Sequence, residues 1–134
     1  MGGIATTSAG RAVVPNALEK YYFVATYCHY IIVSMIWFEW SDDKAANNRR
    51  KHGIAFRDAT QVFNDPFAIA GEDHIESGER RWQIIGMMER VIVVLVAYTI
   101  EEVGQDEVIR LISARRATRK ERIRYEQNRQ KISY

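Results

Sequence analysis

The run of residues 91–98 is apolar at nearly every position, and it constrains the fold more than any other feature of this chain. A strand with apolar side chains on both sides needs both faces covered, so it lies inside a sheet rather than at an edge. The flanking segments, residues 81–88 and 108–114, alternate apolar and polar positions, as strands with one buried face do. We therefore expect a sheet with residues 91–98 at its centre.

Segments with helical signals precede and follow this predicted sheet. Ser41 is suited to cap a helix that ends at Gly53, and residues 56–63 repeat apolar side chains every three or four positions. Residues 117–127 have the composition of a closing helix, and residues 67–70 form a possible further strand. This order predicts an α+β fold with an N-terminal strand and two helices, an antiparallel sheet of about four strands and a C-terminal helix.

The first 34 residues differ from the rest of the chain. Residues 1–16 are small and polar, and we expect them to be disordered. Residues 21–38 contain no charged side chain, which raises the question of a membrane span, but the polar residues among them favour a strand. Because Met35 offers an internal start, we expect residues 1–34 to be a mis-assigned or dispensable extension and residues 35–134 to form the domain. A signal anchor is the alternative interpretation.

The cysteine and histidine content favours a cytoplasmic protein without a metal or cofactor. Cys28 is the only cysteine, so neither an intrachain disulfide nor a four-cysteine zinc site is possible. With no recognisable secretory signal, a reducing cytoplasm is the expected location, and no membrane partner is expected. The acidic residues around His74 are expected to form a solvated loop rather than a metal site.

Positive charge is concentrated in the last quarter of the chain. Nine basic and two acidic residues lie between Arg110 and Lys131, whereas the rest is close to neutral or acidic. Such a local excess indicates binding to a polyanion, most simply a nucleic acid. Arg115 and Arg116 lie at a strand-to-helix junction, where two adjacent guanidinium groups repel each other unless an anion is close. The residues after them form, as an alternative, the solvated side of a helix.

The residue types around this stretch are suited to RNA cleavage. RNA carries its own nucleophile, the 2′-hydroxyl, so a protein has to supply a base, cations that hold the phosphate and an acid for the leaving oxygen, and no metal is required. Alternation along the strands would place Glu79 on one sheet surface with Arg81. The candidates are Glu79, His52 or Lys51 as the base, Arg81, Arg110 and Arg115 as the phosphate clamp, and Tyr98 or His52 as the acid, with Lys44, Arg116, Tyr98 and Tyr125 as further RNA contacts.

Each of these residues also has a purely structural interpretation. Arg110 would pair equally well with a cross-strand acid such as Glu79. His52, next to a glycine that ends a helix, is more often a cap than a catalyst. Lys44 would then belong to a solvated helix face, and Trp40 would be a core residue rather than a base-stacking platform.

The chain carries a series of short motifs: Phe38-Glu39-Trp40, Lys44, Asn48, Lys51-His52-Gly53, Val62-Phe63-Asn64-Asp65-Pro66, Glu79, Arg81-Trp82, Tyr98-Thr99 and the segment from Arg110 to Ala117 with Glu121 and Tyr125. In this order, over about residues 36–125, they resemble the BrnT toxin family. The resemblance implies a RelE-like fold and a small metal-independent ribonuclease that arrests translation and growth as the toxin of a type II toxin–antitoxin pair. Ser41 replaces the family's usual aspartate, and residues 100–106 form a longer and more acidic connection than expected.

The resemblance also implies a partner. The family's antitoxin is BrnA, which has a ribbon-helix-helix DNA-binding part, and the complex represses its own operon, so DNA would be contacted only through the antitoxin complex. A non-catalytic module that binds nucleic acid or a partner protein is the alternative function. The matches expected to be functional are Lys51, His52, Glu79, Arg81, Arg110 and Arg115.

Overall fold

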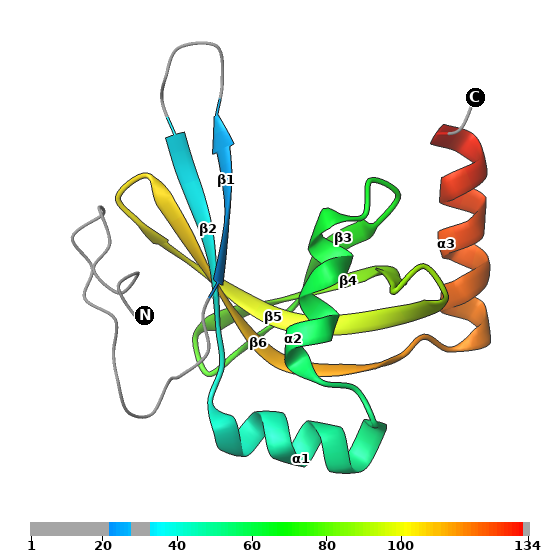
Figure 1. The fold of residues 1–134 in the computed structure, drawn as a ribbon, viewed down its shortest axis with the longest axis horizontal. Coiled ribbons are helices and arrows are strands. Elements are labelled where there is room, and N and C mark those ends of the chain that lie inside the picture. The colour runs from blue at the N-terminus through cyan, green and yellow to red at the C-terminus, as the bar shows by residue number, and fades with distance from the viewer. Residues whose placement is uncertain (1–21, 28–32, 133–134) are drawn as a thin grey trace.

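A six-stranded sheet forms the framework of the chain, with the strand order β1-β2-β6-β5-β4-β3. The computed structural model describes residues 22–27 and 33–132 (Figure 1). The α+β class is as predicted, but the sheet is mixed rather than antiparallel, because β2 runs parallel to β6. The elements are β1 (Tyr22–Tyr27), β2 (Val33–Glu39), α1 (Asp42–His52), α2 (Phe56–Ala59), the 3-10 helix η2 (Thr60–Asn64), β3 (Ile69–Glu76), β4 (Glu79–Met88), β5 (Ile92–Val103), β6 (Asp106–Arg116) and α3 (Arg119–Ile132).

The apolar strand β5 lies between β4 and β6, and both of its faces are covered, as predicted. One face points into a first core, to which the segment that contains α2 and η2 contributes; the other points into a smaller second core with Tyr125 of α3. The first core contains Phe38, Trp40, Ile54, Phe56, Ala59, Val62, Ile84, Met88, Val94, Val96, Tyr98, Ile109, Leu111 and Ala114, and the second Ile85, Val93, Leu95, Ala117 and Tyr125.

Helix α1 begins and ends as the sequence predicts. The Ser41 hydroxyl accepts a hydrogen bond from the backbone N–H of Lys44 at 3.1 Å, and Gly53 closes the helix in the left-handed conformation with φ 72°. The helix carries few large apolar side chains and is held by buried Asn48 instead. The Asn48 amide donates to the carbonyls of Ala114 (2.9 Å) and Ile54 (3.0 Å) and accepts from the N–H of Ala114 (3.0 Å).

The helix expected over residues 56–63 is split into one α-helical turn and the 3-10 helix η2. Its apolar residues do face the first core, with Val62 fully buried. The tight approach of η2 to β4 depends on Gly86, since a Cβ atom there would lie 2.9 Å from the Cβ of Val62. Glycine at this position therefore sets how closely the helical segment packs on the sheet.

The strands of the hairpins are longer than their sequence patterns suggested. The acidic run around His74, expected to be a loop, belongs to the exposed edge strand β3, because β3 pairs with β4 up to the turn at Ser77 and Gly78. Likewise, residues 100–106 do not form a long loop: β5 continues to Val103, and a two-residue connection that begins with Gly104 (φ 65°) leads into β6. Ladder hydrogen bonds outweigh the low strand propensity of the acidic side chains in both hairpins.

Helix α3 starts with a capping box. The backbone N–H of Glu121 donates to the Thr118 hydroxyl at 3.2 Å, and the Thr118 N–H donates to the Glu121 carboxylate at 2.8 Å. Farther along, the Tyr125 ring is buried in the second core, and its hydroxyl donates to Asp65 at 2.6 Å. Figure 1 shows α3 rising at one end of the sheet, away from α1.

The N-terminal strand β2 pairs on its other side with β1 in an antiparallel register that joins Tyr22 to Phe38 and Tyr27 to Val33. Strand β1 therefore lies within residues 1–34, the segment expected to be an extension. The disorder expected for residues 1–16 falls outside the described residues. Among the residues that the structure describes, no helix is long and apolar enough to cross a membrane.

Candidate active site

Polar residues line up across one face of the sheet, where β2, β6 and β5 lie side by side. Glu39 on β2 is the register partner of Arg110 on β6, and Arg110 is in turn the partner of Thr99 on β5. Residues directly opposite each other on neighbouring strands project from the same face. This polar row therefore lies on the sheet surface opposite the first core.

A polar cavity of about 270 Å³ opens at this row. It combines side chains from four strands and from the first turn of α1, so residues far apart in the sequence meet there. We call it the active-site cavity. It is lined by Glu39, Lys44, Glu79, Thr99, Glu101, Val108 and Arg110.

An ion pair between Glu39 and Arg110 organises the cavity. The Glu39 side chain is 1% exposed, and its carboxylate accepts a hydrogen bond of 2.8 Å from the Arg110 guanidinium, whose side chain is 45% exposed. A buried carboxylate holds a guanidinium in a defined orientation through a charge-assisted hydrogen bond. One side of Arg110 is thus fixed by Glu39, while the exposed remainder is available to an anion in the cavity.

Glu79 and Lys44 approach the same cavity from different elements. Glu79 is the first residue of β4, directly after the turn that follows β3, and its side chain is 56% exposed. Lys44 lies in the first turn of α1, which begins three residues after Glu39. A solvent-accessible carboxylate, a lysine and an arginine therefore surround one cavity.

Arg81 lies next to this group without lining the cavity. One of its terminal nitrogens is 3.8 Å from the Glu79 carboxylate, and the side chain is 22% exposed. Its Nε is buried, and among the described residues no acceptor forms a hydrogen bond with it. The register of β4 and β5 ends with the pair of Trp82 and Tyr98. One residue farther, the same register would place Arg81 opposite Thr99. The polar row thereby extends toward β4.

His74 continues the row onto the edge strand, because it is the register partner of Arg81. Its ring nitrogens lie 3.1 Å from the Glu76 carboxylate and 2.6 Å from that of Asp73. These hydrogen bonds, with Glu76 first and Asp73 second, raise the pKa of His74 above its ordinary value of 6.5. The imidazolium form is therefore favoured, and His74 adds positive charge beside Arg81 in mildly acidic solution.

The structure does not bring Arg115 into the cavity. A β-bulge in β6 turns Arg115 onto the same sheet face as Arg110, but five residues farther along the strand. Its guanidinium makes two hydrogen bonds, of 3.0 and 3.1 Å, to the Glu121 carboxylate of the α3 capping box. This pairing raises the pKa of Arg115 and lowers that of Glu121. The repulsion expected between Arg115 and Arg116 is thus relieved by an internal anion, and exposed Arg116 lies outside the cavity.

The remaining predicted site residues also lie elsewhere. Lys51 and His52 occupy the exposed last turn of α1, at the opposite end of the helix from Lys44. Tyr98 points into the first core, packs edge-on against Phe63 at 4.9 Å, and has its pKa raised by burial. The hydroxyl of Tyr125 is taken by Asp65, and burial together with this hydrogen bond raises its pKa strongly. Neither tyrosine presents a ring to solvent.

Four of the residues that line the cavity were not functional candidates in the sequence: Glu39, Thr99, Glu101 and Val108. Glu39 stands between two large aromatic residues and reads as part of a core strand, and Thr99 directly follows the apolar run. The parallel pairing of β2 with β6, which brings Glu39 to Arg110, leaves no local signal in the sequence. Among the described residues, no group of three or more His, Cys, Asp or Glu side chains is arranged to hold a metal ion.

A family model identifies the family of this chain. The family model for "Ribonuclease toxin, BrnT, of type II toxin-antitoxin system" matches residues 40–121, well over half of the chain. A crystal structure of the Brucella abortus ribonuclease toxin BrnT has 26% sequence identity and a TM-score of 0.44, over 60% of this chain and 94% of that chain. No curated protein matches. The chain belongs to the BrnT family of ribonuclease toxins of type II toxin–antitoxin systems.

Proposed function

We propose that this toxin is a metal-independent endoribonuclease that cleaves RNA at the active-site cavity and thereby inhibits translation and growth. The observation that carries the proposal is the meeting of Glu79, Arg110 and Lys44, from three different elements, around one polar cavity. A general base, a phosphate-binding guanidinium and a proton donor are the groups that cleavage by the 2′-hydroxyl requires.

Glu79 acts as the general base in this mechanism. Its exposed carboxylate takes the proton of the 2′-hydroxyl, and the 2′-oxygen attacks the adjacent phosphorus. As the new phosphorus–oxygen bond forms, the bond to the 5′-oxygen of the next nucleotide breaks, which leaves a 2′,3′-cyclic phosphate. The Lys44 ammonium gives a proton to the departing 5′-oxygen. Every proton therefore has a donor and an acceptor among the cavity residues.

Arg110 stabilises the charge that builds up on the phosphate. The guanidinium is oriented by Glu39, so no rotational freedom has to be lost when the phosphate arrives. Arg81 supplies a second guanidinium at the side of Glu79.

The antitoxin of this toxin is, in this proposal, a BrnA-like protein with a ribbon-helix-helix part. Membership of a type II family implies a protein antitoxin, and the chain's resemblance to BrnT motifs supports BrnA as its type. DNA would be contacted by the antitoxin within the complex and not by the toxin alone. Release of the toxin from the complex would expose the active-site cavity to RNA.

Cleavage of RNA by purified toxin in the presence of EDTA tests the catalytic proposal. We expect Arg110→Ala and Glu79→Gln to lower the single-turnover rate by about 100-fold or more, because each removes a group used in the transition state. Arg116→Ala and Glu126→Gln are the matched controls, since both side chains are exposed and neither lines the cavity. The controls should cleave like the wild type.

Two results would overturn the proposal. Cleavage that persists in Arg110→Ala and Glu79→Gln would place the chemistry outside the cavity. RNA that stays intact, while the toxin binds it with an affinity that falls steeply with salt, would instead identify a non-catalytic binding module. Circular dichroism of every variant separates a loss of rate from a loss of fold.

A further inference from the structure

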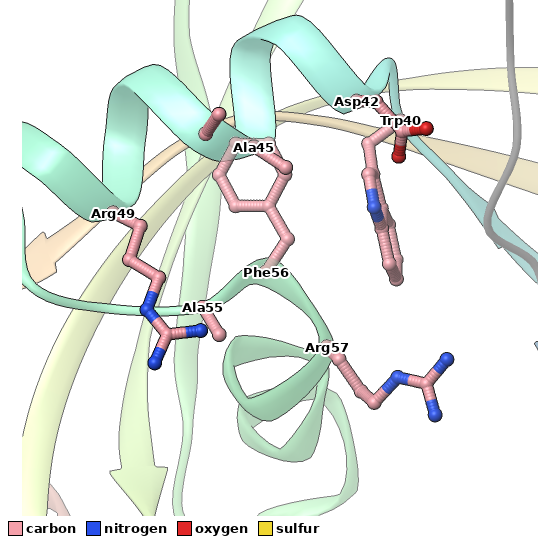
Figure 2. A pocket seen from close by; sticks show the side chains of 8 residues that line it. Trp40, Asp42, Ala45, Arg49, Ala55, Phe56 and Arg57 are labelled. Carbon is pink, nitrogen blue, oxygen red and sulfur yellow. The ribbon is translucent and has the colours of Figure 1, made fainter.

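A second pocket lies between α1 and α2, apart from the active-site cavity (Figure 2). Glu39 lines the active-site cavity, whereas the next residue, Trp40, lines this pocket, so the two openings flank the junction of β2 and α1. The pocket has a volume of about 280 Å³, slightly below the range of small-molecule sites. We call it the α1–α2 pocket. It is lined by Trp40, Asp42, Ala45, Ala46, Arg49, Ala55, Phe56 and Arg57.

The interior of the α1–α2 pocket is apolar. Phe56 lies at its centre in Figure 2, beneath Ala45 of α1, and its ring meets Trp40 edge-on at a centroid distance of 6.0 Å. Both rings are almost fully buried, with 1% of Phe56 and 4% of Trp40 exposed. Small alanine side chains around these rings leave the space that a side chain of another molecule would fill.

Arginines stand at the rim of this apolar space. Figure 2 shows Arg49 descending from α1 on one side of Phe56 and Arg57 extending from α2 on the other. Both arginines are exposed, and in the part of the chain that the structure describes neither forms an ion pair. Asp42, at the N-terminus of α1, is the one carboxylate in the lining. The rim is therefore positive around Phe56.

We propose that the α1–α2 pocket docks an acidic segment of the antitoxin. An apolar side chain of that segment enters between the alanines, and flanking carboxylates pair with Arg49 and Arg57. An apolar centre surrounded by arginines is the arrangement of a protein–protein hot spot. The existence of an antitoxin follows from the family, so this inference deepens the partner part of the proposed function and does not depend on the catalytic mechanism.

RNA fits this pocket less well than an acidic protein segment does. Sequence-independent binding of single strands relies on aromatic faces on which bases stack. Trp40 and Phe56 belong to the first core and are almost fully buried, so their rings are closed to stacking by a base. A phosphate backbone would pair with the arginines but leave the apolar centre unfilled. A peptide that carries carboxylates around one apolar residue would both pair with the arginines and fill the apolar centre.

If the antitoxin docks at this pocket, the residues that bind the antitoxin differ from the residues that cleave RNA. Helix α1 contributes Lys44 to the active-site cavity and Arg49 to the α1–α2 pocket. An antitoxin anchored at Arg49 is therefore held on the same helix as Lys44, the proposed proton donor, but outside the active-site cavity. Variants of the pocket should escape the antitoxin and still cleave RNA.

The test uses the full-length toxin and the antitoxin encoded with it, with affinity measured by titration calorimetry and RNA cleavage measured on the free toxin. We expect the double variant Arg49→Glu with Arg57→Glu to bind the antitoxin on the order of 100-fold more weakly, because attraction becomes repulsion. Ala46→Phe, which fills the pocket from an exposed position of α1, should also weaken binding. Cleavage by both variants should equal that of the wild type.

The matched control is Arg50→Glu with Arg124→Glu, which reverses the same number of charges at exposed positions outside the pocket. Equal loss of affinity in the control and the pocket variant would overturn the proposal, because net charge alone would then explain binding. Unchanged antitoxin affinity with loss of RNA cleavage would overturn it in favour of an RNA contact. Antitoxin affinity can be measured on a toxin that does not cleave RNA, so the result can be interpreted even if the catalytic proposal fails.

Discussion

Replacement of Asn48 by alanine is predicted to destabilise the toxin more than any other truncation of a polar residue on α1. Asn48 is 5% exposed and makes three buried hydrogen bonds, two to the backbone of Ala114 and one to the carbonyl of Ile54. Strand β2 pairs with β6 only up to Arg110, so beyond that point the amide of Asn48 takes the place of a neighbouring strand. Alanine cannot make these hydrogen bonds, so the buried N–H and C=O of Ala114 and the C=O of Ile54 lose this partner.

The expected magnitude follows from these three hydrogen bonds. Each contributes ~1 kcal/mol net, and a buried backbone group that loses its partner costs ~1–3 kcal/mol. The free energy of unfolding should therefore fall by about 3 kcal/mol or more in Asn48→Ala, out of the ~5–15 kcal/mol typical of a domain. With a urea m-value of ~1–3 kcal/mol/M, the midpoint should move down by about 1–3 M.

Urea unfolding followed by circular dichroism measures this loss, with Asn47→Ala as the control. Asn47 is exposed on the same helix, so its replacement should change stability by less than ~0.5 kcal/mol. A loss below ~1 kcal/mol in Asn48→Ala would refute the reasoning, because α1 would then be held by something other than this amide. Since α1 carries Lys44 into the active-site cavity, we also expect the variant to cleave RNA more slowly at temperatures where it remains folded.

Three further predictions concern residues around the cavity. Arg115→Ala should lower the melting temperature through loss of its paired hydrogen bonds to Glu121 and leave RNA cleavage unchanged; slower cleavage at unchanged stability would restore Arg115 as a phosphate ligand. Tyr125→Phe should lose ~1 kcal/mol of stability in urea by removing the hydrogen bond to Asp65, again with full activity, and a neutral effect would argue against that bond. His74 should titrate above pH 6.5 in an NMR experiment, so its stabilising contribution is complete below pH 6.5 and is lost as the pH rises through the raised pKa; a midpoint at or below 6.5 would contradict the ion-pair geometry.

The parts of the fold that depend on local patterns could be predicted from the sequence. The central strand follows from an uninterrupted apolar run, and α1 follows from Ser41 at its start and Gly53 at its end. The acidic segments could not be predicted in the same way. Their strands are stabilised by ladder hydrogen bonds to a neighbouring hairpin arm, and that pairing is set by the turns rather than by side-chain polarity.

The candidate site was predictable only in part, and the reasons are geometric. Glu79 and Arg110 meet at the cavity because strand alternation and hairpin register both place them on one sheet face. The predicted structural ion pair of Arg110 exists, but its partner is Glu39 rather than Glu79, because a parallel neighbour cannot be inferred from alternation alone. Arg115 was predicted to hold the phosphate but pairs with Glu121 instead. The capping box of Thr118 and Glu121, which positions this carboxylate, was not recognised in the sequence.

The number of basic residues along the sequence and the lining of the cavity therefore indicate different residues as contacts for an anion. Most of the basic residues between Arg110 and Lys131 lie on α3 or at its start, and only Arg110 lines the active-site cavity. Arg49 and Arg57, which were not among the predicted site residues, lie together at the rim of the α1–α2 pocket. The proposed surfaces for RNA and for the antitoxin are therefore defined by where individual arginines lie in the fold, at the active-site cavity and at the α1–α2 pocket, rather than by charge density along the sequence.

The chemistry of the RNA ends tests the central claim most directly. Wild-type toxin in EDTA should convert RNA into fragments that end in a 2′,3′-cyclic phosphate, and a substrate with a 2′-deoxynucleotide at the cleaved position should remain intact. Mass spectrometry of the products identifies the end group. Fragments with a 3′-hydroxyl, or cleavage of the 2′-deoxy substrate, would show that the 2′-hydroxyl is not the nucleophile and would contradict the role assigned to Glu79.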